Sequence, residues 1–390
     1  MNMNEQMKES EESILHTYNR FPVVFEKGQG CYLYDSEGKE YLDFAAGIAV
    51  NSLGYHYPGY DEALKDQIDK LMHISNLYYN EPIIEAGAKL VKASKMSKAF
   101  FTNSGTEAIE GALKAAKKYA YVRDGHADHE IIAMNHSFHG RSIGALSVTG
   151  TAHYREPFEP LMGGVKFADF NNLESVKAQI TDKTCAIITE VVQGEGGIYP
   201  AKKEFLEGLR QICDEKDIML IFDEIQCGMG RTGHYFAWQA YGVQPDIMTS
   251  AKALGCGVPV GAFVLNEKAA KASLEPGDHG TTYGGNPFVC AAVSKVFDID
   301  ENDKIIEHVQ EMTPYLEQKL DEIVAKHECA VTRRGMGFMQ GIVIQGRSVG
   351  EVVKAALAKG LLVISAGSDV LRIVPPLVIT KEHIDKMAAI

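Results

Sequence analysis

The sequence contains no long apolar segment, which argues against a membrane-spanning helix. Such a helix needs about 20 consecutive apolar residues, and no run among the 390 residues approaches that length. The first thirteen residues, MNMNEQMKESEES, are polar and lack the apolar centre of a secretory signal. We therefore expect a cytoplasmic protein that does not enter a membrane.

Positive charge is also scarce. The chain carries 39 lysines and arginines against 52 aspartates and glutamates, a formal net charge of -13. This balance argues against nucleic acid or an anionic membrane as a partner. An anionic small molecule stays open as a substrate, because one arginine can bind a carboxylate.

Cysteine and histidine show neither a disulfide framework nor a structural metal motif. The seven cysteines are an odd number and form no CxxC pair, which favours reduced thiols in a cytoplasm. Four histidines lie at positions 126, 129, 136 and 139, but their spacing matches no standard zinc motif. We expect most of them at the surface and no bound metal.

Nucleotide-binding signatures are missing as well. The segment 335–341, GMGFMQG, misplaces the last glycine of the dinucleotide fingerprint and precedes a strand-like run instead of a helix. The turn at 101–108, FTNSGTEA, lacks the lysine of a Walker loop. Both nucleotide interpretations are rejected.

Alternating strand-like and helical stretches make up most of the chain. We expect strands at 99–102, 130–134, 184–191, 218–223 and 246–250, and helices at 5–19, 60–71, 85–94, 105–120 and 203–215. This alternation predicts an α/β domain with a mostly parallel sheet. The strand at 259–265 is expected at a sheet edge, because Pro259 cannot donate a ladder hydrogen bond.

The domain organisation follows from a change in pattern after residue 288. A hairpin near residues 31–44 and the last hundred residues predict a smaller α+β domain that combines the two ends of the chain. We expect residues 1–55 to form its N-terminal segment, 56–288 the large domain and 289–390 its C-terminal part.

Two apolar runs end in charged residues that indicate chemistry. Residues 219–222 lead into Asp223 and Glu224, and residues 247–248 lead through a short polar stretch to Lys252. Buried parallel strands would deliver these charges to the rim of the sheet where ligands bind. An aspartate and a lysine there suggest pyridoxal 5'-phosphate, whose pyridinium nitrogen pairs with the acid and which forms a Schiff base with the lysine.

The other strand exits carry residues with two possible roles each. The turn before Gly105 and Thr106 opens a helix, which suits either a phosphate or plain helix capping. Residues 190–197, EVVQGEGG, allow either close backbone approach to a ligand or a turn with solvated acids. Phe138 can stack on a flat ring and Arg141 can bind a carboxylate. Arg372 lies in an apolar strand and needs an acid partner or an anionic ligand.

Taken together, these motifs resemble the class III, or omega, pyridoxal-phosphate aminotransferases. The matching segments are NSGTEA, SFHGR, EVVQGEGG, FDEIQCGMGRTG, SAKALGCGVPVGA and HGTTYGGNP. The resemblance extends from Gly28 to Pro376. It implies the aspartate-aminotransferase-like fold, known as fold type I, and a homodimer with shared active sites.

The resemblance also implies a role for individual residues. Lys252 would hold the cofactor as a Schiff base, Asp223 would pair with its ring nitrogen and Gln226 with its ring hydroxyl. Phe138 would stack on the ring, while Gly105, Thr106 and the neighbouring subunit's Thr282 would bind its phosphate. For the substrate, the implied residues are Arg141, Thr281, Tyr18 and a Glu195–Arg372 pair that opens for 2-oxoglutarate.

Within the family, the chain is similar to the acetylornithine branch of arginine biosynthesis. The implied reaction moves the terminal amino group of N2-acetyl-L-ornithine to 2-oxoglutarate, giving N-acetyl-L-glutamate 5-semialdehyde and L-glutamate. Ile48 stands where ornithine enzymes place a tyrosine, whereas Tyr18 matches a substrate-contacting tyrosine of those enzymes. Ornithine, 4-aminobutyrate and succinyldiaminopimelate stay open as donors. An aminomutase and a non-catalytic binding protein are the less favoured alternatives.

Overall fold

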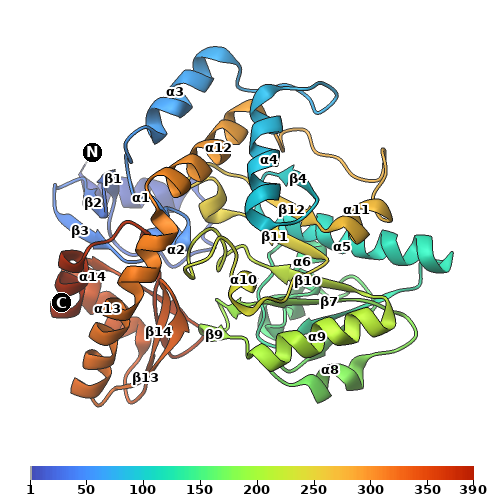
Figure 1. The fold of residues 1–390 in the computed structure, drawn as a ribbon. Helices are drawn as coiled ribbons and strands as arrows, with labels where there is room; N and C mark the ends of the chain where they lie inside the picture. The colour runs from blue at the N-terminus through green and yellow to red at the C-terminus, as the bar shows by residue number, and fades with distance from the viewer. Residues whose placement is uncertain (1) are drawn as a thin grey trace.

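A computed structural model describes residues 2–390, in which a seven-stranded sheet forms the centre of the larger part of the molecule (Figure 1). Its order is β4 (Lys98–Thr102), β12 (Gly261–Leu265), β11 (Ile247–Ser250), β10 (Met219–Asp223), β7 (Thr184–Glu190), β5 (Glu130–Met134) and β6 (Val165–Ala168). The neighbouring strands from β11 to β6 are all parallel. The predicted α/β fold with a mostly parallel sheet is confirmed.

Both faces of this sheet are buried, because successive side chains of a strand point to opposite sides. Met219 and Ile221 of β10 pack in one apolar cluster with α5 (Gly105–Asp124). Leu220 and Phe222 pack in the other cluster with α9 (Lys203–Lys216). The strands therefore read as continuous apolar runs, as expected for a parallel sheet covered by helices.

The prediction that residues 259–265 form an edge strand was wrong. β12 begins at Gly261, two residues after Pro259, and pairs with β4 on one side and β11 on the other. The proline lies in the preceding loop, so its missing N–H does not interrupt a ladder. Two further elements, β6 and α8 (Leu173–Gln179), were not predicted from the sequence. The first helix is shorter than predicted, because α1 (Met3–Ser13) ends at Ser13.

Two smaller sheets and three helices are built from segments near the two ends of the chain (Figure 1). One sheet contains β1 (Phe25–Gln29), β2 (Tyr32–Asp35), β3 (Glu40–Asp43) and β15 (Leu361–Leu362), and another contains β13 (Ala330–Met336), β14 (Met339–Ile344), β17 (Val370–Ile373) and β16 (Ile364–Ala366). The helices α13 (Ile305–Lys326), α14 (Val349–Ala358) and α15 (Lys381–Ala389) accompany them. β15 runs parallel to β3, so residues from both ends of the chain share a sheet.

The helix α12 (Pro287–Asn302) lies beside α3 (Tyr60–Lys70) and α4 (Glu81–Ser94). This helix therefore packs on two helices that precede the first strand of the large sheet in the sequence. The domain boundaries drawn from the sequence stay a prediction. Among residues 2–390, no helix is long and apolar enough to cross a membrane.

Candidate active site

A cavity of about 510 Å³ opens at the carboxyl ends of the parallel strands. Its lining includes seven residues chosen from the sequence: Gly105, Thr106, Phe138, Arg141, Asp223, Gln226 and Lys252. This volume is in the range of small-molecule and cofactor sites. The segments that carry these residues are far apart in the sequence, and the sheet topology brings them to one place.

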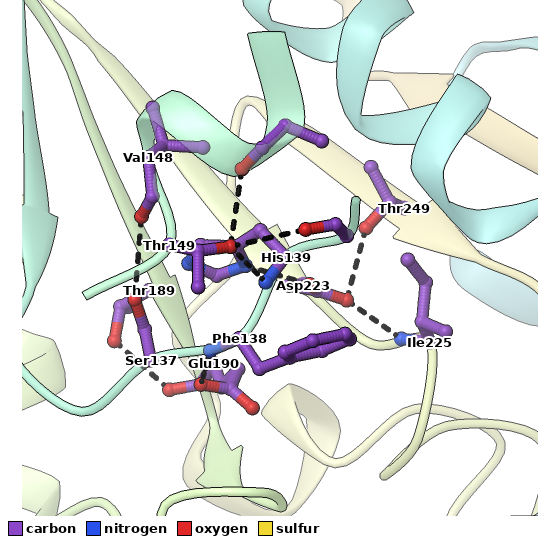
Figure 2. A network of polar contacts seen from close by, with 12 residues as sticks. Ser137, Phe138, His139, Val148, Thr149, Thr189, Glu190, Asp223, Ile225 and Thr249 are labelled. Carbon is purple, nitrogen blue, oxygen red and sulfur yellow. Dashed lines mark hydrogen bonds and ion pairs between the residues drawn. The ribbon is translucent and has the colours of Figure 1, made fainter. Parts of the chain in front are cut away.

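Asp223 ends β10 at the floor of this cavity and is held by three hydrogen bonds (Figure 2). Its Oδ2 lies 2.7 Å from Nδ1 of His139, and its Oδ1 accepts from the N–H of Ile225 at 3.0 Å and from the hydroxyl of Thr249 at 3.3 Å. These contacts fix the carboxylate in one orientation. The role of His139 was not predicted from the sequence. This residue and His129 are both buried, so the expectation that most of the four histidines are exposed was wrong.

Glu190 is a second acid at the cavity floor, one strand away from Asp223. The two residues are paired in register at the ends of β7 and β10. Burial, and next the charge of Asp223, raise the pKa of Glu190 well above its ordinary value. Its carboxyl group accepts from the N–H of Phe138 at 3.3 Å (Figure 2). It also accepts from the N–H of Gly194 at 3.1 Å. The solvated-acid interpretation of this residue is wrong, because the Glu190 carboxyl group is buried and accepts hydrogen bonds from the backbone.

Glu224 follows Asp223 in the sequence but has a structural role. Its two carboxylate oxygens accept from the N–H groups of Ala237 and Trp238, both at 2.8 Å. The side chain is fully buried, and this burial raises its pKa to about 7. Of the two acids at this strand end, Asp223 alone lines the cavity.

Lys252 lies beyond the end of β11, in a backbone conformation with φ of 51°. Left-handed backbone is uncommon for residues with a side chain and is often found at functional sites. Burial lowers the pKa of Lys252 to about 8, with Arg372 acting in the same direction against the charges of Glu195 and Asp223. An amine with this lowered pKa is readily deprotonated near neutral pH and can act as a nucleophile or base.

The N-terminus of α5, just after the end of β4, forms part of the cavity wall. Ser104 caps the helix by accepting from the N–H of Glu107 at 3.3 Å, and the first N–H groups of a helix have no acceptor within it. A Cβ atom at Gly105 would lie 2.9 Å from Cδ1 of Ile225, so the backbone approaches the cavity closely there. Capping at this turn is therefore compatible with an anion, because the cap leaves the first amides of the helix available.

Phe138 and Arg141 line the wall above the acids. The guanidinium of Arg141 stacks over the ring of Tyr154, 3.8 Å from its centroid, and lies 5.4 Å from that of Phe138. The arginine is exposed at the cavity wall and is available to an incoming carboxylate.

Arg372, which is buried, and Glu195, which is partly buried, form an ion pair that also includes Gln226. Nη2 of Arg372 donates to Oε2 of Glu195 at 3.2 Å, and Nη1 donates to Oε1 of Gln226 at 3.1 Å. Although burial opposes ionisation, Arg372 holds the pKa of Glu195 below its ordinary value. Arg372 thus has the acid partner that its place in an apolar strand required.

Six residues named from the sequence do not line this cavity: Glu195 and Arg372 of the ion pair, and Thr281, Thr282, Tyr18 and Ile48. The hydroxyl of Thr281 accepts from Nδ2 of Asn103 at 3.2 Å and so lies near its edge. Thr282, Tyr18 and Ile48 are exposed, and the side chain of Tyr18 is 73% accessible.

Comparisons with known proteins agree with this geometry. Residues 14–390 match the family described as aminotransferase class-III. The chain belongs to the class-III aminotransferases. It is 48% identical to the acetylornithine aminotransferase of Clostridium acetobutylicum, covering 98% of each chain, and 43% identical to the succinylornithine transaminase of Yersinia pseudotuberculosis, covering 96% of this chain and 92% of that one. The crystal structure of ornithine aminotransferase from Toxoplasma gondii superposes with a TM-score of 0.95 at 28% identity, covering 100% of this chain and 94% of that chain.

This class-III aminotransferase depends on pyridoxal 5'-phosphate, and its residues fit that group. The uncapped amides of α5 suit a phosphate, Phe138 a flat ring, Asp223 a ring nitrogen and Lys252 a covalent link. When bound, the cofactor withdraws electrons from the substrate carbon that loses its proton. Asp223 would lie beside the ring nitrogen, and the amine of Lys252 would move that proton.

Proposed function

We propose that this aminotransferase moves the terminal amino group of N2-acetyl-L-ornithine to 2-oxoglutarate, giving N-acetyl-L-glutamate 5-semialdehyde and L-glutamate. The observation that carries the proposal is the 48% identity, over nearly the whole chain, to an acetylornithine aminotransferase. Lys252 would carry the proton in both halves of this exchange, and Arg141 would bind a carboxylate of the substrate.

The Glu195–Arg372 pair supports the two-substrate exchange. When the pair is closed, Arg372 is occupied by Glu195, and Arg141 is the arginine of the cavity that can bind a donor with one carboxylate. Opened, it would give a second arginine to the dicarboxylate acceptor. Gln226 contacts both members of the pair, with its Nε2 donating to Oε1 of Glu195 at 3.4 Å. An aminomutase needs no such acceptor, which makes that alternative less suitable.

Ile48 supports an acylated donor because it offers no hydrogen-bond acceptor to a free α-amino group. It lies on a left-handed turn in which all four residues, Ala46–Ala49, have φ between 47° and 67°. Asp43 holds this turn, accepting from the N–H groups of Ala45 at 2.9 Å and Ala46 at 2.8 Å. A β-branched residue in this strained conformation is uncommon, which favours a specific role for the side chain.

Steady-state kinetics with competing donors test the proposed substrate. We expect kcat/KM for acetylornithine to exceed that for ornithine, 4-aminobutyrate and succinylornithine, with 2-oxoglutarate as the acceptor. Ile48→Tyr should shift the ratio toward ornithine by roughly tenfold, the value of one hydrogen bond to a charged amine, whereas Ile48→Leu should leave the ratio unchanged. A wild-type preference for 4-aminobutyrate would contradict the proposal.

The proposal extends to a cytoplasmic homodimer in which Thr282 reaches the phosphate site of the neighbouring subunit. Leu77 and Tyr79 are large side chains that are 86% and 94% accessible in the single chain. Tyr283, next to Thr282, is also exposed, and its ring lies 5.2 Å from that of His73. An apolar surface of this kind is typical of an interface between subunits.

Charge introduced on this surface should separate the subunits. We expect Leu77→Asp combined with Tyr79→Asp to convert a dimer to a monomer in sedimentation velocity, with weaker cofactor retention. The matched control is Tyr121→Asp, an exposed aromatic residue of α5, which should stay dimeric. A wild-type protein that sediments as a monomer would rule out the shared site.

A further inference from the structure

Arg141, the arginine that would bind the substrate carboxylate, depends on neighbouring groups for its position. Its side chain is exposed at the cavity wall, and a long side chain with several rotatable bonds loses much conformational freedom when it is held in one place. Among residues 2–390 it forms no ion pair, in contrast to Arg372, which pairs with Glu195. Contacts other than charge pairing must therefore set the direction of its guanidinium.

The backbone beside Arg141 is fixed by the next residue. The hydroxyl of Ser142 donates to Oε1 of Glu110 at 2.5 Å and lies 2.8 Å from the hydroxyl of Thr106. The N–H of Ser142 donates to the same hydroxyl of Thr106 at 3.2 Å. Both Thr106 and Glu110 belong to the first turns of α5, so this segment is tied to that helix. The side chain of Arg141 is the part that stays adjustable.

Tyr154 supplies the contact that directs this side chain. Cζ of Arg141 lies over the ring of Tyr154, 3.8 Å from its centroid, and is farther from the ring of Phe138, at 5.4 Å. The N–H donors of a guanidinium form a planar fork, so a ring against its face leaves them free to bind a carboxylate at the edge. The tyrosine ring also meets Phe138 edge to face, with centroids 6.1 Å apart and planes inclined by 82°.

Tyr154 is itself held in place by the short helix α7 (Ala152–Arg155). Nη1 of Arg155 donates to the carbonyl of Thr149 at 2.9 Å. The guanidinium of Arg155 lies 4.0 Å from the ring centroid of Phe167, in β6 of the large sheet. The helix is thus attached to the sheet, and the partly buried ring of Tyr154 is a firm support.

We propose that Tyr154 is a positioning residue for substrate recognition, whose ring holds the guanidinium of Arg141 in the orientation that binds a carboxylate. The inference rests on the proposed function, in which Arg141 binds a carboxylate of the substrate. Tyr154 does not itself line the active-site cavity, so it acts through Arg141. A cation–π contact at a partly exposed site changes an equilibrium by about two- to fivefold, which sets the size of the expected effect.

A double-mutant cycle on the cofactor-loaded enzyme tests this role, with Tyr154→Leu, Arg141→Met and the two combined. Tyr154→Leu should lower kcat/KM for the amino donor by about fivefold when Arg141 is present, through a higher KM and an unchanged kcat. In the Arg141→Met background the same change should cost less than about twofold, because no guanidinium is left to direct. Tyr154→Phe keeps the ring and should stay within about twofold of the wild type.

Tyr199→Leu is the matched control, because it removes the ring of another arginine–tyrosine stack. Cζ of Arg334 lies 3.6 Å from the ring centroid of Tyr199, and neither residue lines the active-site cavity. This control should keep kcat/KM within about twofold of the wild type. Equal losses from Tyr154→Leu in both backgrounds, or no loss in either, would overturn the inference.

The choice of donor separates this inference from the proposed reaction. Acetylornithine, ornithine and 4-aminobutyrate all carry a carboxylate, and the cycle uses the one that the wild type prefers. A preference for 4-aminobutyrate would therefore contradict the proposed substrate and leave the cycle intact. If Arg141→Met left kcat/KM unchanged for all three donors, both the role of Arg141 and that of Tyr154 would be overturned.

Discussion

Replacement of Lys252 by alanine is expected to lower kcat by at least about 10⁴-fold. A positioned general base or acid contributes roughly 10² to 10⁴, and this lysine would supply the covalent attachment of the cofactor as well. The amine lies in the active-site cavity with its pKa lowered by burial to about 8, so no water molecule can replace it at equal strength and position. The change would be measured as the single-turnover rate with a saturating amino donor.

Borohydride reduction distinguishes a chemical role of Lys252 from a structural one. Reduced wild-type enzyme should carry a pyridoxyl label on the peptide that contains Lys252, and the alanine variant should carry none there. Lys268→Ala serves as the control, because this lysine pairs with Asp217 at 2.6 Å and lies outside the active-site cavity. A label elsewhere in the wild type, or activity of the alanine variant within tenfold of normal, would contradict the role.

The fold was predictable from the sequence to the extent that apolar runs and their ends are visible in it. The buried strand that ends at Asp223 is a continuous apolar segment, and such segments leave few alternatives. The position of β12 was not predictable in the same way. Pro259 indicated a break in regular structure near β12. The strands that flank β12 are set by pairing between distant segments, which the local sequence pattern does not show.

Active-site residues were predictable where the residue type itself implies a chemistry. They were less predictable where the role of a residue depends on its neighbours in the folded structure. Lysine and aspartate at strand ends pointed to the cofactor, whereas His139 resembled any other histidine of a polar stretch. Its role appears when folding brings Nδ1 to 2.7 Å from Asp223. Glu190 was ambiguous for a similar reason: whether an acid is solvated or buried beside another acid depends on strand register.

Asp223→Asn is expected to lower kcat/KM by about 10³-fold. A carboxylate beside the ring nitrogen favours the protonated ring, and an amide of nearly the same shape removes that charge. Preorganised electrostatic groups of this kind are worth about 10² to 10³ in rate each, and the partner His139 loses its anion as well. The pH titration of the cofactor's ring absorption should shift to lower pH in the variant, which a merely structural defect would not cause.

Glu190→Gln is the matched control for Asp223→Asn, because the two acids are register neighbours on adjacent strands. Burial and the charge of Asp223 raise the pKa of Glu190 and so favour its uncharged form, which an amide resembles in shape and charge. The variant should keep kcat/KM within about threefold, the small change expected when no charge is lost. Equal losses in both variants would mean that Glu190 carries charge in the working enzyme, and a loss below tenfold in Asp223→Asn would contradict the pairing with the ring. A larger loss of kcat/KM in Asp223→Asn than in Glu190→Gln would assign the catalytic charge to Asp223, at the end of β10.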